Sequence, residues 1–208
     1  MNSQIKIELE LIAERKLNIG AGGVAPKIKA DMPMMSIKAF NNEDYVFIPG
    51  STIKGLLRTS LIRISSLLGY ENITYTVNPE DKMGDDIVVR LFGKPNQNVQ
   101  SKVSVESVMI KESTETLTHV RIDDKSRTAI EGGLFSIEYL PIGSIIRAVI
   151  EARELNIEEA RALMAAILNL RYERIGKSGI VNVRIRDASG IESYLSDPII
   201  KEIYESLR

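Results

Sequence analysis

The sequence lacks cysteine altogether and contains a single histidine, His119. Without cysteine the chain can form no disulfide bond and no thiolate metal site, and it has no thiol nucleophile. One histidine cannot supply a histidine pair for acid–base catalysis or a histidine-rich zinc site. A carboxylate acting with a metal ion is therefore the catalytic group that these absences favour.

Long hydrophobic runs are also missing, although hydrophobic residues make up 44% of the 208. No apolar run approaches the about 20 residues that a membrane-spanning helix needs. The first fifteen residues contain no signal-peptide core. We therefore expect a soluble, cytoplasmic protein with no membrane partner. A chain of this length can bury a substantial core, so we expect a single domain over residues 1–208 with excursions from it.

The formal net charge is only −1, but the charges are unevenly distributed along the chain. Residues 15–63 hold eight cations against three acids, and residues 171–186 hold five cations against one acid. The two basic segments surround glycine-rich turns, so they could together form one RNA-facing surface. Random clustering of cations on solvated faces is the alternative that composition leaves open.

Hydrophobic periodicity predicts strands and helices in turn. Strands are expected at 5–11, 102–110, 134–138, 144–152 and 180–185, with a hairpin formed by 37–40 and 45–48. Long helices are expected at 51–68 and after Asn156, where Glu159 completes a capping box, and a short helix follows Pro198. Residues of about 70–95 are interpreted as an insertion, and 111–130 as a projecting β-hairpin. This succession is compatible with an α+β, ferredoxin-like core.

The segment 45–69, YVFIPGSTIKGLLRTSLIRISSLLG, carries the most specific local signal. An apolar strand runs through Pro-Gly into a helix for which Ser51 is the expected N-cap. Lys54 and Arg58 lie four residues apart near the helix N-terminus, where unpaired amides and the helix dipole favour anions. These residues predict a phosphate seat. An ordinary amphipathic helix with solvated cations is the alternative.

Six short motifs follow one another along the chain. They are LNIGAGG at 17–23, DMP at 31–33, IPGSTIKGLLR at 48–58, RLFG at 90–93, RID with EGGLF within 121–135, and a glycine-containing loop within 170–183. In this order they resemble the motifs of the RAMP superfamily, the RNA-binding proteins of CRISPR effector complexes. The chain is most similar to the repeating backbone subunit of type III effectors.

The resemblance implies a ferredoxin-like (modified RRM) core with insertions and a protruding β-hairpin called the thumb. It implies a ribonucleoprotein subunit of antiviral defence that binds guide RNA and complementary target RNA, and that assembles with other effector subunits and copies of itself. We hypothesise that the thumb wedges the guide–target duplex. The expected RNA-binding residues are Asn18, Gly20, Gly22, Gly23, Lys27, Lys29, Ser51, Lys54, Arg58, Arg121, Arg174, Lys177 and Ser178. For the loop that contains Lys177, a tight turn before the last strand is the alternative.

Asp31 is the candidate catalytic residue and metal ligand. It follows two cations in a glycine- and proline-flanked loop that we expect to be flexible. A carboxylate there could hold Mg²⁺, or orient a ribose 2′-hydroxyl for attack on the adjacent phosphate. In the type III backbone subunits that the chain resembles, an aspartate at the matching D-x-P step cleaves target RNA. Two alternatives remain: a non-cleaving structural paralogue, and a stand-alone endonuclease that processes guide precursors.

Overall fold

A four-stranded antiparallel sheet forms the centre of the molecule. The computed structural model describes residues 4–20, 30–40, 42–73, 86–94 and 100–208. The strands β1 (Gln4–Ala13), β4 (Val103–Val105), β8 (Ile145–Arg153) and β9 (Val181–Ser189) lie in the order β4-β8-β1-β9. Along β1 and β8, buried residues alternate with more exposed ones, as a sheet with one covered face requires. Residues 5–11 and 144–152 are therefore confirmed as strands.

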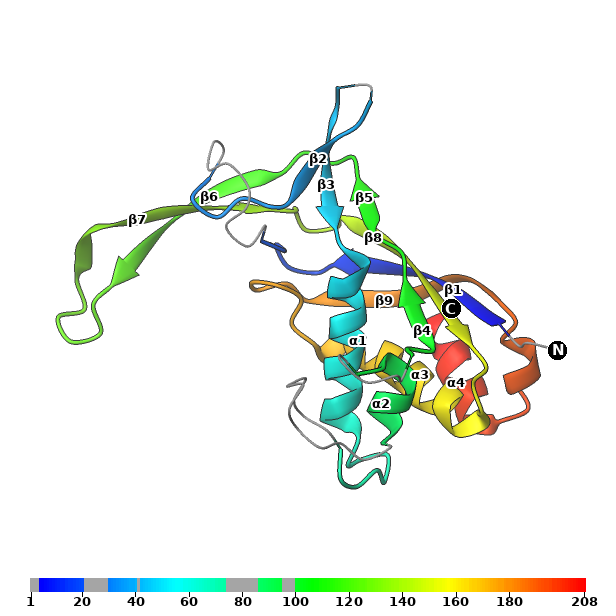
Figure 1. Ribbon diagram of the computed structural model, residues 1–208. Helices are drawn as coiled ribbons and strands as arrows, with labels where there is room; N and C mark the ends of the chain where they lie inside the picture. Colours follow the sequence, from blue (N-terminus) through cyan, green and yellow to red (C-terminus); the bar gives the residue numbers. More distant parts are fainter. Residues whose placement is uncertain (1–3, 21–29, 41, 74–85, 95–99) are drawn as a thin grey trace.

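Two long helices, α1 (Gly50–Ile64) and α3 (Ile157–Asn169), pack against the covered face of this sheet (Figure 1). The two helices contact each other: the buried Ser60 hydroxyl of α1 donates to the Ala166 carbonyl of α3 at 2.8 Å. The succession β1-α1-β4-β8-α3-β9, with this strand order, is that of a ferredoxin-like core. The predicted α+β, ferredoxin-like fold is confirmed.

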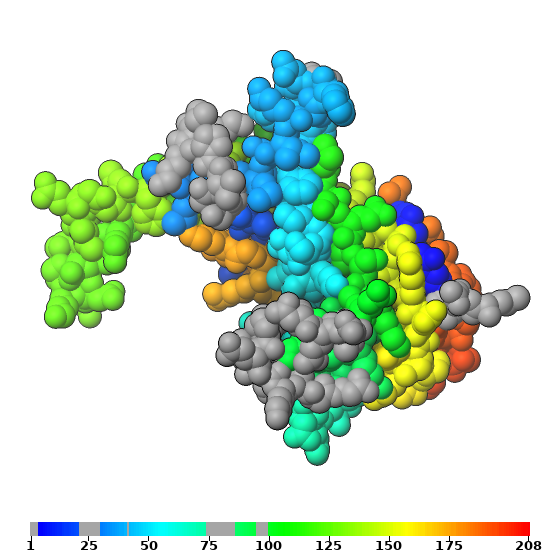
Figure 2. Space-filling model, in the orientation of Figure 1, coloured from blue at the N-terminus to red at the C-terminus, as the bar shows by residue number. Residues whose placement is uncertain are grey.

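Two β excursions leave the core. A small sheet has the order β2-β3-β5 and consists of β2 (Ser36–Lys38), β3 (Asp44–Ile48) and β5 (Val108–Ile110). A long hairpin of β6 (Glu115–Ile122) and β7 (Ala129–Tyr139) projects away from the body, as Figures 1 and 2 show. The projecting hairpin expected over 111–130 thus covers Glu115–Tyr139, and we call these residues the thumb below. The strand expected at 134–138 is the base of its second arm.

The single strand expected over 102–110 was wrong. The segment divides into β4, in the central sheet, and β5, in the small sheet. The break lies where the Gly50 backbone crosses the chain: a Cβ on Gly50 would meet the Val105 carbonyl oxygen at 2.0 Å. The Gly50 amide donates to the Ser107 hydroxyl at 3.1 Å in the same crossing. Alternation in sequence cannot show that a strand changes sheets midway.

The helix starts were predicted with mixed success. The capping box of Asn156 and Glu159 on α3 is confirmed. The predicted N-cap of α1, Ser51, was wrong. The helix begins at Gly50, so Pro49 is the N-cap residue. The C-terminal helix is α4 (Pro198–Leu207), and the short 3₁₀ turns are η1 (Leu170–Tyr172) and η2 (Glu192–Tyr194). None of the helices in the described residues is long and apolar enough to span a membrane.

The segment interpreted as an insertion contains a buried element that the sequence analysis missed. Residues 74–85 and 95–99 lie outside the described residues, but α2 (Ile87–Phe92) between them belongs to the core. The Asp86 carboxylate caps α2 by accepting from the amides of Val88 at 2.8 Å and Val89 at 3.0 Å. Six residues are too few for helical periodicity to be recognised against a polar flank.

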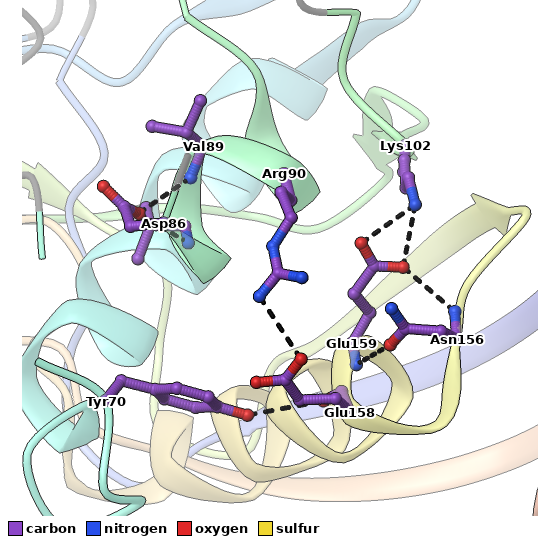
Figure 3. Close-up of polar contacts among 9 residues, drawn as sticks. Tyr70, Asp86, Val89, Arg90, Lys102, Asn156, Glu158 and Glu159 are labelled. Atoms are coloured by element: carbon purple, nitrogen blue, oxygen red, sulfur yellow. Dashed lines mark hydrogen bonds and ion pairs between the residues drawn. The ribbon is translucent and has the colours of Figure 1, made fainter. Parts of the chain in front are cut away.

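Polar contacts join α2 and β4 to the start of α3 (Figure 3). Glu159 is 1% exposed, and Lys102 Nζ donates to its two carboxylate oxygens at 2.9 and 2.8 Å. The same carboxylate accepts from the Asn156 amide at 2.9 Å. On the outer side, Arg90 pairs with Glu158 at 3.3 Å. The Lys102 ammonium and the Asn156 amide thus compensate the buried charge of Glu159, as a buried carboxylate requires.

Candidate functional site

Asp31 lies at the base of the thumb. Its side chain is exposed at the surface, and Oδ2 accepts hydrogen bonds from the amide and the hydroxyl of Ser136, each at 2.8 Å. The Asp31 amide donates in turn to the Ser136 hydroxyl at 3.0 Å. Ser136 belongs to β7, so the candidate catalytic carboxylate is attached to the thumb strand.

The chain after Asp31 continues along the same strand. The Met32 amide donates to the Ser136 carbonyl at 3.0 Å, and the Glu138 amide donates to the Met32 carbonyl at 3.1 Å. The Met34 amide then donates to Oε2 of the buried Glu138 at 2.8 Å. Asp31 is therefore held in a hydrogen-bonded segment rather than in the flexible loop that the flanking glycines and proline predicted. The sequence could not reveal these contacts, because the partners of Asp31, Met32 and Met34 on β7 are all more than 100 residues away.

Asn18 connects this segment to the rest of the site. It is 1% exposed, and its side-chain amide donates to the carbonyls of Glu138 at 2.6 Å and Met32 at 3.4 Å. Its own carbonyl accepts from the Lys177 amide at 2.9 Å. With its side chain buried, Asn18 joins three segments of the chain, and its contact with RNA stays a prediction.

The late glycine-containing loop packs closely on Asn18. Gly176 has φ +56°, and a Cβ there would meet the Asn18 carbonyl oxygen at 2.0 Å. The loop closes through the Ile175 amide, which donates to the Gly179 carbonyl at 2.9 Å. The loop is thus a tight turn before the last strand, which was one of the two interpretations of its sequence. It also presents exposed side chains, namely Arg174, Lys177 and Ser178.

Lys177 brings a cation next to the Asp31 segment. Its Nζ lies against the sulfur of Met32, the residue after Asp31. A thioether sulfur is a weak hydrogen-bond acceptor. This contact therefore holds the Lys177 ammonium only weakly. The structure in this way joins three of the predicted site residues, Asp31, Asn18 and Lys177, into one cluster.

The two cations of the predicted phosphate seat lie on α1. Lys54 and Arg58 are both half-buried, and burial lowers the pKa of each side chain below its ordinary value. The neighbouring charge of Arg58 lowers the pKa of Lys54 further. Two cations held this close to each other favour an anion beside them. Ser51 lies exposed in the first turn of the same helix.

Arg58, however, has a structural partner that the sequence analysis missed. Its Nη1 donates to the Gly93 carbonyl at 3.2 Å, at the C-terminal end of α2. Gly93 has φ +73° and ends the RLFG motif. Nη2 of Arg58 is buried and has no hydrogen-bond partner among the described residues. The arginine of the IPGSTIKGLLR motif thus joins α1 to the RLFG motif, and phosphate contact by Lys54 and Arg58 stays a prediction.

The remaining predicted residues fall into two groups. Gly20 is exposed and bridges to Met34, next to the Asp31 segment, whereas Arg121 lies exposed on β6 of the thumb. Gly22, Gly23, Lys27 and Lys29 lie outside the described residues. Nothing in the sequence marks Ser136 or Glu138 as site residues, because within an alternating strand a serine and a glutamate resemble ordinary surface residues.

The described residues give Asp31 no set of protein ligands for a metal. They contain no group of three or more histidine, cysteine or acidic residues that could hold an ion. The buried Glu138 beside Asp31 has its carboxylate bonded to the Met34 amide and the Thr114 hydroxyl. Mg²⁺ in phosphate-binding sites is held by one or two carboxylates together with water and substrate phosphates. Asp31 alone fits such a shared site.

Comparison with known proteins identifies the family. The model of the RAMP superfamily matches residues 15–179, and the chain therefore belongs to the RAMP superfamily. Among solved structures, the chain is similar to one from a cryo-EM structure of type III-B Cmr-beta in the apo state. The likeness has a TM-score of 0.62 and 13% identity, and it covers 88% of this chain and 97% of that chain. It establishes the shared fold. A search of curated proteins found no match.

Proposed function

We propose that this chain is a guide-RNA-binding backbone subunit of a type III CRISPR effector, and that it forms a filament along the guide with copies of itself or paralogues. Membership of the RAMP superfamily and the fold shared with a chain of a type III-B Cmr-beta structure support the proposal. The observation that carries it is the cluster at the thumb base, where Asn18 and Lys177 contact each other and both contact Met32, the residue after Asp31.

The guide is bound through its shape and phosphates. Lys54 on α1, and Arg174 and Lys177 on the late loop, supply cations at the surface. Backbone contacts of this kind position RNA without reading its sequence. Sequence recognition then belongs to base pairing between guide and target.

The thumb supplies an apolar element for the guide–target duplex. Val120 and Leu134 are directly opposite each other on β6 and β7, and they are 46% and 71% exposed. An apolar pair on a projecting hairpin can insert between base steps and unstack them, as apolar wedges do in nucleic-acid-binding proteins. Residues 134 and 136 point to the same side of β7, because side chains alternate along a strand. The apolar pair therefore faces the same side as Asp31.

Cleavage of the target uses the Asp31 carboxylate. Asp31 orients a ribose 2′-hydroxyl, whose oxygen forms a bond to the adjacent phosphorus as the bond to the 5′-oxygen breaks. The 2′-hydroxyl releases its proton to water, and the leaving 5′-oxygen takes a proton from water. The products are a 2′,3′-cyclic phosphate and a 5′-hydroxyl, so the step needs no oxidant or co-reactant. Mg²⁺ bound by Asp31 and RNA phosphates would stabilise the charge that develops on the phosphate.

The substitution Asp31→Asn tests this role in the complete effector complex with guide, target and Mg²⁺. It preserves the shape of the side chain and removes its charge, so target binding should remain while cleavage is lost. A target with 2′-deoxyribose at the scissile position should likewise bind and resist cleavage. Rapid cleavage by Asp31→Asn would reject the catalytic role and leave a non-cleaving structural paralogue.

A further inference from the structure

The exposed Asp31 and the half-buried Ser136, 105 positions apart, are joined by three hydrogen bonds. Two donors of Ser136, its amide and its hydroxyl, converge on the same oxygen of Asp31, each at 2.8 Å. The hydroxyl accepts in return from the Asp31 amide at 3.0 Å. A serine hydroxyl has one proton to donate. Here that proton is directed at the Asp31 carboxylate, so the serine constrains the orientation of the carboxylate.

Ser136 itself is fixed within the thumb. It lies directly opposite Thr118 on β6, two residues from the pair of Val120 and Leu134 on the same face of the hairpin. The Ser136 carbonyl also accepts from the Met32 amide at 3.0 Å, so the backbone on both sides of the carboxylate is attached to β7. A movement of the thumb base therefore displaces the Asp31 carboxylate with it.

We propose that Ser136 is a positioning residue for Asp31, and that through Ser136 the placement of the thumb on the guide–target duplex sets the orientation of the carboxylate. This inference rests on the proposed function, since it concerns the same cleavage step. It assigns to the thumb a second role besides wedging the duplex. A catalytic group that is misplaced by about 1 Å can lose about 100-fold in rate. Ser136 contacts Asp31 and not the reacting atoms, so it acts through orientation.

The test measures cleavage and binding separately in the complete complex. Under single-turnover conditions with saturating target, Ser136→Ala should lower the cleavage rate about 10- to 100-fold. The Kd for target should stay within about twofold, because the thumb surface that meets RNA is unchanged. Ser136→Thr keeps the hydroxyl and should restore most of the rate, and Ser136→Cys keeps the size with a weaker donor and should fall between them. Thr118→Ala is the matched control, since it removes the hydroxyl directly across the hairpin and should cleave like the wild type.

Asp31→Asn, assayed in parallel, separates the two proposals. If Asp31→Asn abolishes cleavage while Ser136→Ala cleaves within twofold of the wild type, positioning by Ser136 is refuted and the catalytic role of Asp31 stands. If Asp31→Asn cleaves normally, the catalytic role fails and the positioning role fails with it. A loss of rate in Ser136→Ala matched by an equal loss of target affinity, or shared by Thr118→Ala, would show a structural role and overturn the inference.

Discussion

Replacement of Gly176 by alanine should be much more damaging than its position in an exposed loop suggests. The new Cβ would lie 2.0 Å from the Asn18 carbonyl oxygen and 2.9 Å from the Asn18 carbonyl carbon. Both atoms are backbone, so no side-chain rotation can relieve the overlap. The loop has to move away from Asn18, and the hydrogen bond from the Lys177 amide to the Asn18 carbonyl is lost.

The size of the effect follows from three contributions. A left-handed conformation costs a non-glycine residue about 1 to 2 kcal/mol. Loss of one hydrogen bond costs about 1 kcal/mol, and a buried carbonyl left without a donor costs about 1 to 3 kcal/mol. Because the last two overlap and are counted once, we expect a loss of about 2 to 5 kcal/mol in the free energy of unfolding. For a chain of this size, 1 kcal/mol corresponds to about 2 to 4 °C in Tm, so the expected decrease is about 10 °C.

Gly143 provides a matched control for the conformational part of this loss. It has φ +89°, also left-handed, but a Cβ there would meet nothing within 4 Å among the described residues. Gly143→Ala should therefore lose only about 1 to 2 kcal/mol, or about 4 °C. Thermal unfolding followed by circular dichroism measures both variants. Equal decreases in Tm would refute the reasoning, since they would show that the late loop is not held against Asn18.

Three further predictions follow from the site and the core. Lys54→Ala should weaken guide binding about equally across sequences and lower the salt dependence of the binding constant by about one in slope. Arg58→Ala should mainly lower Tm. An unchanged salt slope for Lys54→Ala would mean that α1 is merely amphipathic. Replacement of residues 124–127 by a shorter turn should leave Tm unchanged but alter assembly or the cleavage pattern, and identical patterns would argue against a wedge. The hydrogen bond from Arg161 lowers the pKa of Asp197 below its ordinary value of 3.8, so the Asp197 carboxylate adds stability above that pH and loses it as the pH falls through the lowered pKa. Urea unfolding should show Asp197→Asn less stable than the wild type at neutral pH and equally stable in strong acid; a pH-independent difference would contradict this assignment.

The sequence by itself determined the repeating local features of this protein. Strict alternation predicted β1 and β8, because a sheet with one covered face needs a buried side chain at every second position. The capping box at Asn156 was predictable because its two partners lie within one helical turn. The order of six short motifs predicted the RAMP superfamily, which the family model confirms over residues 15–179.

Contacts between distant parts of the chain were decided only by the tertiary structure. The attachment of Asp31 to Ser136 spans 105 residues, and the bond from Asn18 to the Glu138 carbonyl spans 120. Neither has a periodicity or a spacing that a linear pattern can reveal. The partner of Arg58 was likewise hidden in the sequence. Its place near a helix N-terminus predicts an anion site, but in the folded chain its guanidinium donates to the Gly93 carbonyl of the distant RLFG motif. Local rules assign residues to elements, but only folding brings together the partners that complete a site.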